Sequence, residues 1–121
     1  MIVLALSLAG GLGAAARLLV DGLVRSRAGS RFPFGTVLIN VTGSLLLGVL
    51  TGLVAFHGAP GVVRTVAGTG FCGGYTTFST ASFETARLLQ EHRRLAALLN
   101  AAGTLTLTLL AGGLGLWLVG A

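Results

Sequence analysis

The chain has 121 residues, of which 54% are hydrophobic and 9% are charged, and its mean hydropathy is +0.93. Because a soluble domain carries about 25% charged residues, this composition excludes an ordinary soluble protein and indicates a membrane protein. The formal net charge of +5 comes from arginines that lie in short gaps between apolar runs. They are therefore better explained as topology signals and lipid-headgroup contacts than as a nucleic-acid surface.

Four apolar runs follow one another along the chain, over about residues 2–20, 34–56, 61–86 and 95–119. Each is near the roughly 20 residues that a helix needs to cross a bilayer. The sequence therefore predicts a single all-α membrane domain over residues 1–121 with four transmembrane helices. The links between them are predicted over residues 21–33, 57–60 and 87–94.

The first run is rich in small residues, among them Gly10, Gly11 and Gly13. Such residues let helices approach closely in lipid, so we expect this helix to pack tightly against a neighbour. Arg17 follows one turn after Gly13. A lone arginine near a helix end either extends its side chain to the membrane surface or caps another group, and both roles stay open.

Polar and small side chains recur on one face of the second run. Thr36, Asn40, Gly43 and Ser44 are spaced as i, i+4, i+7 and i+8, which places them on the same side of a helix. An asparagine in a membrane helix can bind a neighbouring helix, or it can donate its amide N–H to an anion. Taken alone, the asparagine favours binding to a neighbouring helix. The hydroxyls aligned with it bring the anion-binding role closer to equal weight.

The third run contains the stretch GFCGGYTTFST over residues 70–80. Its glycine pair weakens a helix, and irregular backbone at membrane depth is tolerated only where protein buries it or a wet cavity borders it. We therefore predict a helix that is broken near its middle, with carbonyls and hydroxyls free to handle an ion. Phe78 is either a core ring or a weak anion contact through its positive ring edge. Glu84 is expected to pair with Arg87, three residues on.

The fourth run carries a polar row of Asn100, Thr104 and Thr108, spaced as i, i+4 and i+8. Threonines in membrane helices often bond to carbonyls of their own helix. The alternative is a wetted or helix-packed track opposite the second helix.

No catalytic constellation accompanies these rows. His57 and His92 have no metal-ligand companion at a useful spacing. Asp21, Glu84 and Glu91 are scattered, and a single cysteine excludes an internal disulfide. The sequence therefore predicts that the protein is not an enzyme.

Three motifs together resemble the Fluc/CrcB fluoride channel family over essentially the whole chain. They read Gly10-x-x-Gly13-Ala14-x-x-Arg17, Pro33-x-Gly35-Thr36-x-x-x-Asn40-x-x-Gly43-Ser44, and Gly70-Phe71-Cys72-Gly73-Gly74-x-Thr76-Thr77-Phe78-Ser79-Thr80. The resemblance implies a passive, fluoride-selective channel that exports toxic fluoride from microbial cells across the cytoplasmic membrane. It also implies an antiparallel dimer of four-helix subunits, with two pores along the dimer interface and a central structural Na+.

The resemblance implies roles for individual residues. Backbone carbonyls of Gly73 and Thr76 are expected to bind the Na+, and Asn40 and Phe78 are expected to face the fluoride path. Arg17 matches a structural or vestibule position. Further polar residues expected to line the vestibule or the path are Thr36, Ser79, Thr80, Thr104 and Thr108.

One departure from the family pattern concerns the phenylalanines. The family usually continues Phe-Ser-Thr-Phe, whereas this chain has Ala81, so the second pore phenylalanine is absent. Phe83 lies on another side of the helix and cannot simply replace it. In the fourth helix, Thr104 stands where tyrosine is frequent.

A second departure is the uneven distribution of arginine. The first and third links contain six arginines and the second contains one; they are Arg25, Arg27, Arg31, Arg87, Arg93 and Arg94 against Arg64. The positive-inside rule then places both termini outside. A homodimer whose subunits insert both ways would need nearly balanced charge. An antiparallel homodimer and a heterodimer with an inverted sister subunit therefore both stay open.

Two other functions stay open. A small four-helix exporter of cationic compounds would couple transport to protons through a membrane carboxylate, for which Glu84 is the available candidate. Alternatively, Ala81 would mark a non-conducting partner subunit of a heterodimeric fluoride channel.

Overall fold

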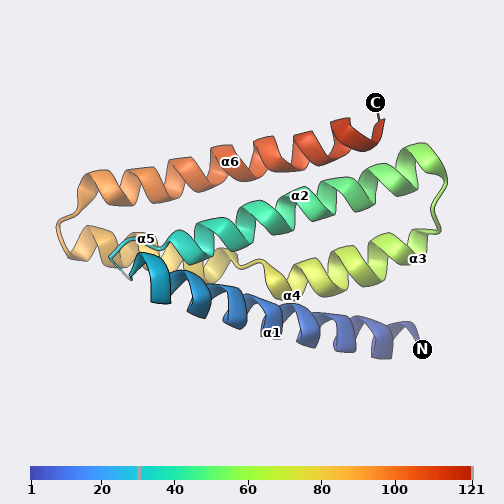
Figure 1. Cartoon of the computed structure of the whole chain (residues 1–121), viewed down its shortest axis with the longest axis horizontal. Coiled ribbons are helices and arrows are strands. Elements are labelled where there is room, and N and C mark those ends of the chain that lie inside the picture. The colour runs from blue at the N-terminus through green and yellow to red at the C-terminus, as the bar shows by residue number, and fades with distance from the viewer. Residues whose placement is uncertain (30, 121) are drawn as a thin grey trace.

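The computed structural model describes residues 1–29 and 31–120, and the ordered elements in this part of the chain are all helical. The two long first helices are α1 (Ile2–Ala28) and α2 (Phe34–His57). The next segment is divided into α3 (Gly61–Val63), the π-helical η1 (Arg64–Cys72), α4 (Gly73–Tyr75) and α5 (Phe78–Gln90). The last helix is α6 (Arg94–Gly120). The predicted all-α class is confirmed (Figure 1).

Three of these helices, α1, α2 and α6, are long and apolar enough to cross a membrane. Their outward-facing leucines are strongly exposed; Leu18 is 70% exposed and Leu109 is 68% exposed. An apolar surface of this extent indicates lipid or another protein around the bundle. The chain is therefore a multi-pass membrane protein.

Helices approach closely where glycines face a neighbouring backbone. A Cβ atom at Gly13 would overlap the Phe71 carbonyl oxygen, and one at Gly74 would overlap the Gly10 carbonyl oxygen. The small residues of α1 thus pack against η1 and α4, as the sequence predicted. A Cβ at Gly115 would lie 2.8 Å from the Val49 backbone nitrogen, because α2 and α6 pack in the same way.

Two predicted links are shorter than expected because helix continues into them. α1 runs to Ala28, so the first link is helical over its first half. The Asp21 carboxylate and the Arg25 guanidinium lie 3.0 Å apart at i, i+4, a pairing that supports these last turns. The third link is likewise helical to Gln90, and the chain turns at His92, which has a φ of 59°.

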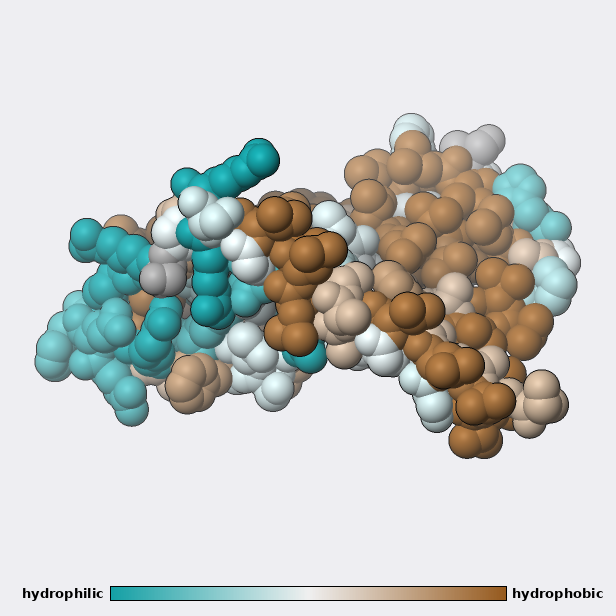
Figure 2. All heavy atoms as spheres, turned by 60° about the horizontal axis from the view of Figure 1, so that its bottom comes forward, coloured by the Kyte–Doolittle hydropathy of each residue, from teal (hydrophilic) through white to brown (hydrophobic). Residues whose placement is uncertain are grey.

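The two ends of the bundle differ in polarity. The start of α1, the end of α6 and the turn before α3 lie at one end, whereas the end of α1, the start of α2 and the α5–α6 turn lie at the other (Figure 1). Hydrophilic residues gather at the second end in Figure 2. That end contains the six arginines of the first and third links.

Candidate functional site

The segment after η1 leaves the helical conformation at two consecutive threonines. Thr76 has φ −80° and ψ 158°, and Thr77 has φ −150° and ψ 117°, so both are extended. The helix ends at Tyr75 and a new helix begins at Phe78. The interruption therefore consists of Thr76 and Thr77, which follow Tyr75.

The side chain of Asn40, on α2, pairs with this interruption. Its amide nitrogen donates to the Thr77 carbonyl oxygen at 3.0 Å, and its amide oxygen accepts from the Thr77 N–H at 2.8 Å. Asn40 is 7% exposed and Thr77 is 9% exposed. The pair replaces helical hydrogen bonds that the extended backbone cannot make, which is necessary for a buried peptide group.

The two threonines also satisfy the neighbouring helix ends. The Thr77 hydroxyl accepts from the Thr80 N–H at 3.1 Å and so caps the start of α5. The Thr76 hydroxyl donates to the Cys72 carbonyl at 2.8 Å, as does the Thr76 N–H. A continuous helix would direct the Thr77 N–H to the Gly73 carbonyl, but this N–H goes to Asn40. The Gly73 carbonyl therefore lacks its helical donor.

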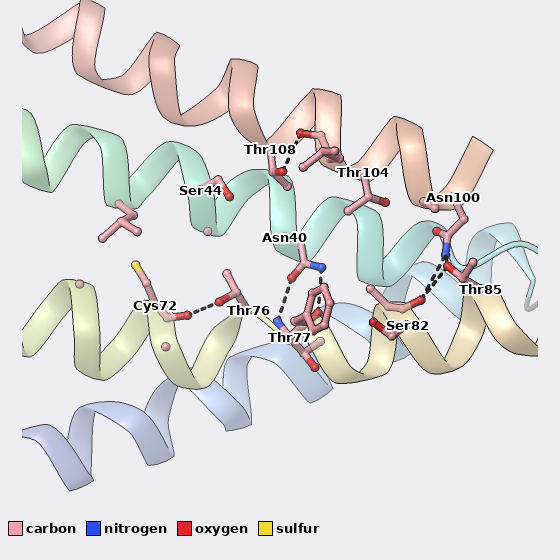
Figure 3. Close-up of a pocket in the computed structure, with 18 of the residues that line it drawn as sticks. Asn40, Ser44, Cys72, Thr76, Thr77, Ser82, Thr85, Asn100, Thr104 and Thr108 are labelled. Carbon is pink, nitrogen blue, oxygen red and sulfur yellow. Dashed lines mark hydrogen bonds between the residues drawn. The ribbon is translucent and has the colours of Figure 1, made fainter. Parts of the chain in front are cut away.

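A cavity of about 1180 Å³, here called the break cavity, lies beside the interruption. Its walls come from α2, η1, α4, α5 and α6, and Figure 3 shows its polar side chains converging from opposite helices. Six of the predicted site residues line it: Asn40, Gly73, Thr76, Phe78, Thr104 and Thr108. Phe78 is 86% exposed, so its ring lies at the open side of the cavity.

Four predicted residues lie outside the break cavity of the single chain. The Thr36 hydroxyl is buried and bonded to Glu84. The Thr80 N–H donates to the Thr77 hydroxyl, and the Ser79 hydroxyl lies 3.5 Å from this Thr77 hydroxyl. Arg17 is half-buried, and its Nε has no hydrogen-bond partner among the described residues. Their roles stay predictions.

The hydroxyls around the break cavity fall into two groups. Those of Thr76, Thr85 and Thr108 donate to carbonyls of their own helical segments, so their hydrogens are already used. In the described part of the chain, the hydroxyls of Ser44, Thr69, Ser82 and Thr104 make no hydrogen bond. The Asn40 amide has one further N–H beyond the one bound to Thr77. The free donors, which include the exposed Arg64 guanidinium, therefore belong to α2, η1, α5 and α6.

The sequence reasoning missed several cavity residues as site residues. They are Ser44, Thr69, Cys72, Thr77, Ala81, Ser82, Thr85 and Asn100. Some signals were present: Ser44 shares a helical face with Asn40, and Asn100 begins the polar row of α6. Ser82 and Thr85 follow Phe78 at helical spacing, and this pattern would have identified them.

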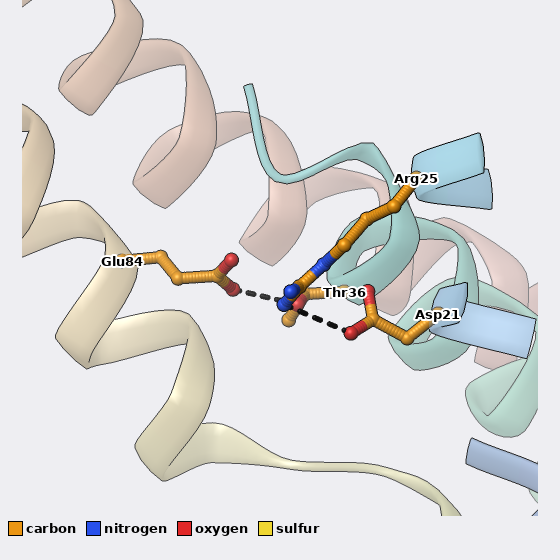
Figure 4. A network of polar contacts seen from close by, with 4 residues as sticks. All are labelled: Asp21, Arg25, Thr36 and Glu84. Carbon is orange, nitrogen blue, oxygen red and sulfur yellow. Dashed lines mark hydrogen bonds and ion pairs between the residues drawn. The ribbon is translucent and has the colours of Figure 1, made fainter. Parts of the chain in front are cut away.

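Glu84 contacts Thr36 rather than Arg87, so the expected pairing is wrong. Glu84 is 7% exposed, and its Oε1 accepts from the Thr36 hydroxyl at 2.6 Å. Arg87 lies instead 3.8 Å from Glu91, because the helix continues for another turn. Figure 4 shows Glu84 and Thr36 beside the Asp21–Arg25 ion pair. A second cavity of about 170 Å³ lies among these groups, at the arginine-rich end.

Metal-binding side chains do not cluster in the described residues, where no group of three or more His, Cys, Asp or Glu could hold an ion. A cation at the interruption would therefore depend on backbone oxygens. The Gly73 carbonyl, whose helical donor goes to Asn40 instead, lies at the C-terminal end of a helical segment and is the kind of group that attracts a hard cation.

Comparison with known proteins identifies the family. A family model described as CrcB-like protein, Camphor Resistance (CrcB), matches residues 4–116. A protein named fluoride-specific ion channel FluC 1, from Leifsonia xyli subsp. xyli, is 58% identical over 120 residues, covering 99% of this chain and 88% of the relative. Fluoride-specific ion channel FluC 2 from Cutibacterium acnes is 48% identical over 117 residues, covering 96% and 95%.

The chain therefore belongs to the CrcB family. The resemblance inferred from the three motifs is confirmed. The relatives are named as ion channels, and the family is one of channels rather than enzymes.

Proposed function

We propose that the chain is a subunit of a fluoride-selective ion channel that exports fluoride passively across the cytoplasmic membrane. One observation supports this most strongly: free hydrogen-bond donors line a large cavity inside an otherwise apolar bundle. Donors at membrane depth are costly unless a partner or an ion uses them. The names of the relatives supply the anion, fluoride.

The break cavity would carry fluoride by replacing its water with protein donors. The groups available for this are the second Asn40 N–H and the hydroxyls of Ser44, Thr69, Ser82 and Thr104. Fluoride is strongly hydrated, so several weak partners must act together to compensate its dehydration. The Phe78 ring at the open side would add its positive edge to the path.

A structural Na+ at the interruption is part of the proposal. The backbone carbonyls of Gly73 and Thr76 would hold it, and the missing helical donor at Gly73 fits this role. When bound, Na+ would supply a fixed positive potential beside the anion path. The chain's own contribution is the Asn40–Thr77 pair, which keeps the carbonyls at the interruption out of a helix.

The channel would be a dimer of inverted subunits, with segment 61–90 as its broken third crossing. The break cavity is open, and Ser82 and Phe78 on its rim are exposed. Lipid tails cannot form hydrogen bonds with the hydroxyls at the open side of the cavity, so a second subunit is the better cover for that side. Ala81 and the six-to-one arginine bias favour a sister subunit in the opposite orientation; a second copy is the other possible partner.

Fluoride efflux from liposomes tests the function. The protein is reconstituted alone and with its inverted sister subunit in KF-loaded liposomes, and fluoride is followed with an electrode. We expect efflux well above that of empty liposomes in at least one of the two preparations. If both preparations release fluoride no faster than empty liposomes do, the proposal is wrong. Efflux that needs both subunits and survives loss of Asn40 in this one would identify it as the non-conducting partner.

The proton-coupled exporter is not supported as a second function. Its required carboxylate, Glu84, lies outside the break cavity, and Thr36 already donates to it. A cation flux that is driven by a pH gradient and lost on Glu84→Gln would reverse this conclusion.

Sodium dependence tests the proposed cation separately. Replacing Na+ by N-methyl-D-glucamine throughout purification should lower the unfolding temperature of the dimer, because the carbonyls of Gly73 and Thr76 would lose the cation that they bind. An unchanged unfolding temperature would argue against the Na+ site but leave the fluoride function standing.

A further inference from the structure

Tyr75, the last residue of α4, is attached to α2 through its hydroxyl. The Tyr75 hydroxyl lies 3.0 Å from the Thr42 hydroxyl. The hydrogen of Thr42 is already used, because this hydroxyl donates to the Leu38 carbonyl at 2.8 Å and to the Ile39 carbonyl at 3.2 Å. A hydroxyl carries a single hydrogen, so Tyr75 is the donor and Thr42 is the acceptor. This hydrogen bond joins the end of α4 to α2.

The ring of Tyr75 lies against a glycine of α2. A Cβ atom at Gly43 would come within 3.2 Å of the Tyr75 ring and would overlap the methyl group of Thr76. The Tyr75 ring also stacks on Phe71, with ring centroids 5.8 Å apart and an angle of 16° between the planes, which is a favourable arrangement for two aromatic rings. The absence of a side chain at Gly43 therefore provides the space that Tyr75 and Thr76 both occupy.

Contacts with α2 fix the residues on both sides of Thr76. Before it, the Tyr75 hydroxyl donates to Thr42. After it, the Thr77 backbone pairs with the Asn40 amide (Figure 3). Thr76 itself is extended, with φ −80° and ψ 158°. Its backbone conformation is therefore set by two separate attachments to the same helix.

The carbonyl of Thr76 has lost its helical donor. In a continuous helix the Thr80 N–H would donate to it, but this N–H donates to the Thr77 hydroxyl at 3.1 Å. The Gly73 carbonyl has lost its helical donor in the same way. The direction of the Thr76 carbonyl follows from the backbone conformation that the Tyr75 contact helps to set. The Tyr75 hydroxyl is thus connected to a group for which we propose Na+ binding.

We propose that Tyr75 is a positioning residue for the cation site: its hydrogen bond to Thr42 keeps the Thr76 carbonyl in the orientation that binds Na+. Without this bond a smaller fraction of the molecules would have the binding orientation, and the apparent affinity for Na+ would fall by that fraction. The inference rests on the proposed structural Na+. It adds a side chain that acts through the backbone rather than as a ligand.

The unfolding temperature, measured over a series of Na+ concentrations, tests the role of Tyr75. N-methyl-D-glucamine replaces Na+ at constant ionic strength, and the concentration at which the unfolding temperature begins to rise is compared between variants. Tyr75→Phe removes the hydroxyl and keeps the ring, and we expect this concentration to increase about two- to tenfold, the factor that corresponds to one hydrogen bond. A purely structural contact would lower the unfolding temperature equally at every Na+ concentration; that result would overturn the proposal.

Thr42→Val tests the other partner of the hydrogen bond. It removes the acceptor and keeps the side-chain shape, so the Na+ dependence should shift by a similar factor. The double variant should shift no further than either single variant, because both changes break the same bond. Ser7→Ala is the matched control, since the Ser7 hydroxyl also donates to a carbonyl four residues earlier, that of Val3, and lies outside the break cavity. Additive shifts, or an equal shift with Ser7→Ala, would contradict the positioning role.

Fluoride efflux separates this inference from the channel function. In KF-loaded liposomes, Tyr75→Phe should conduct like the unmodified protein at high Na+ and more slowly at low Na+. If the unmodified protein conducts fluoride but its unfolding temperature does not respond to Na+, the cation site and the role of Tyr75 are both wrong, whereas the channel function stands. If Na+ raises the unfolding temperature but no fluoride passes, the channel function is wrong, and the Na+ series still decides the role of Tyr75.

Discussion

The amide of Asn40 and the backbone of Thr77 form a closed pair of hydrogen bonds, 3.0 and 2.8 Å long, between α2 and the interruption that follows α4. The pair explains how two extended residues persist inside an apolar bundle. Both polar groups of one residue's backbone are satisfied by a single side chain, which leaves one amide N–H for the cavity. Asn40 therefore joins two roles that the sequence presented as alternatives, as a link between helices and as a free donor.

Replacing Asn40 should lower both the unfolding free energy of the protein and its rate of fluoride efflux. Asn40→Leu keeps the volume but leaves the buried Thr77 N–H and carbonyl unpaired. We expect a loss of about 2–4 kcal/mol of unfolding free energy, from two unsatisfied groups, together with loss of fluoride efflux. Chemical denaturation in detergent measures the first effect and the liposome assay measures the second. Thr51→Val, on the same helix and outside the break cavity, serves as control; equal effects of both changes would contradict the assignment.

The close contact between α1 and α4 predicts that some glycines tolerate a methyl group better than others. Gly74→Ala places a methyl group into the Gly10 carbonyl, so the helices must separate, and we expect a destabilisation of about 1–3 kcal/mol. Gly11→Ala is the matched control, because a Cβ at Gly11 meets nothing within 4 Å. Its helix propensity should make it neutral or slightly stabilising. Unfolding temperatures of the two variants decide the point, and a tolerated Gly74→Ala would disprove the contact.

Substitutions at Glu84 and Thr36 test whether the hydrogen bond between them or the charge of Glu84 stabilises this site. Thr36→Val removes the donor and leaves a buried carboxylate less satisfied, so we expect about 1–3 kcal/mol of destabilisation. Glu84→Gln keeps an oxygen that accepts from the Thr36 hydroxyl, and its cost should be below about 1 kcal/mol. Denaturant unfolding measures both. If Glu84→Gln were the more damaging change, the charge itself, rather than the hydrogen bond, would hold this site.

Much of this architecture could be predicted from helical spacing alone. The apolar runs over residues 2–20, 34–56 and 95–119 predicted the three long helices α1, α2 and α6. Asn40 and Ser44 share a helical face and line the same cavity, although the sequence did not single out Ser44 as a site residue. These successes rest on period and composition, which are local properties of the chain.

The misses depend on contacts between distant segments. Nothing in the sequence near Thr36 indicates that Glu84, on another helix, takes its hydroxyl hydrogen. The hydrogen bond between Tyr75 and Thr42 is likewise visible only once α4 and α2 lie side by side. Helix ends were also misplaced, because Asp21 and Arg25 support helix in a stretch whose charge suggested a link.

The arginine bias predicts a fixed orientation in the membrane. With the two arginine-rich links in the cytoplasm, α3 faces outward. In a Cys72→Ala background, Gly61→Cys should react with a membrane-impermeant thiol reagent on intact cells, since a Cβ there meets nothing within 4 Å. Ser26→Cys, exposed at the arginine-rich end, should react only in inside-out vesicles. If each cysteine reacts from both sides, the subunit inserts in both orientations and an antiparallel homodimer is favoured; one-sided labelling requires a sister subunit to complete the inverted pair.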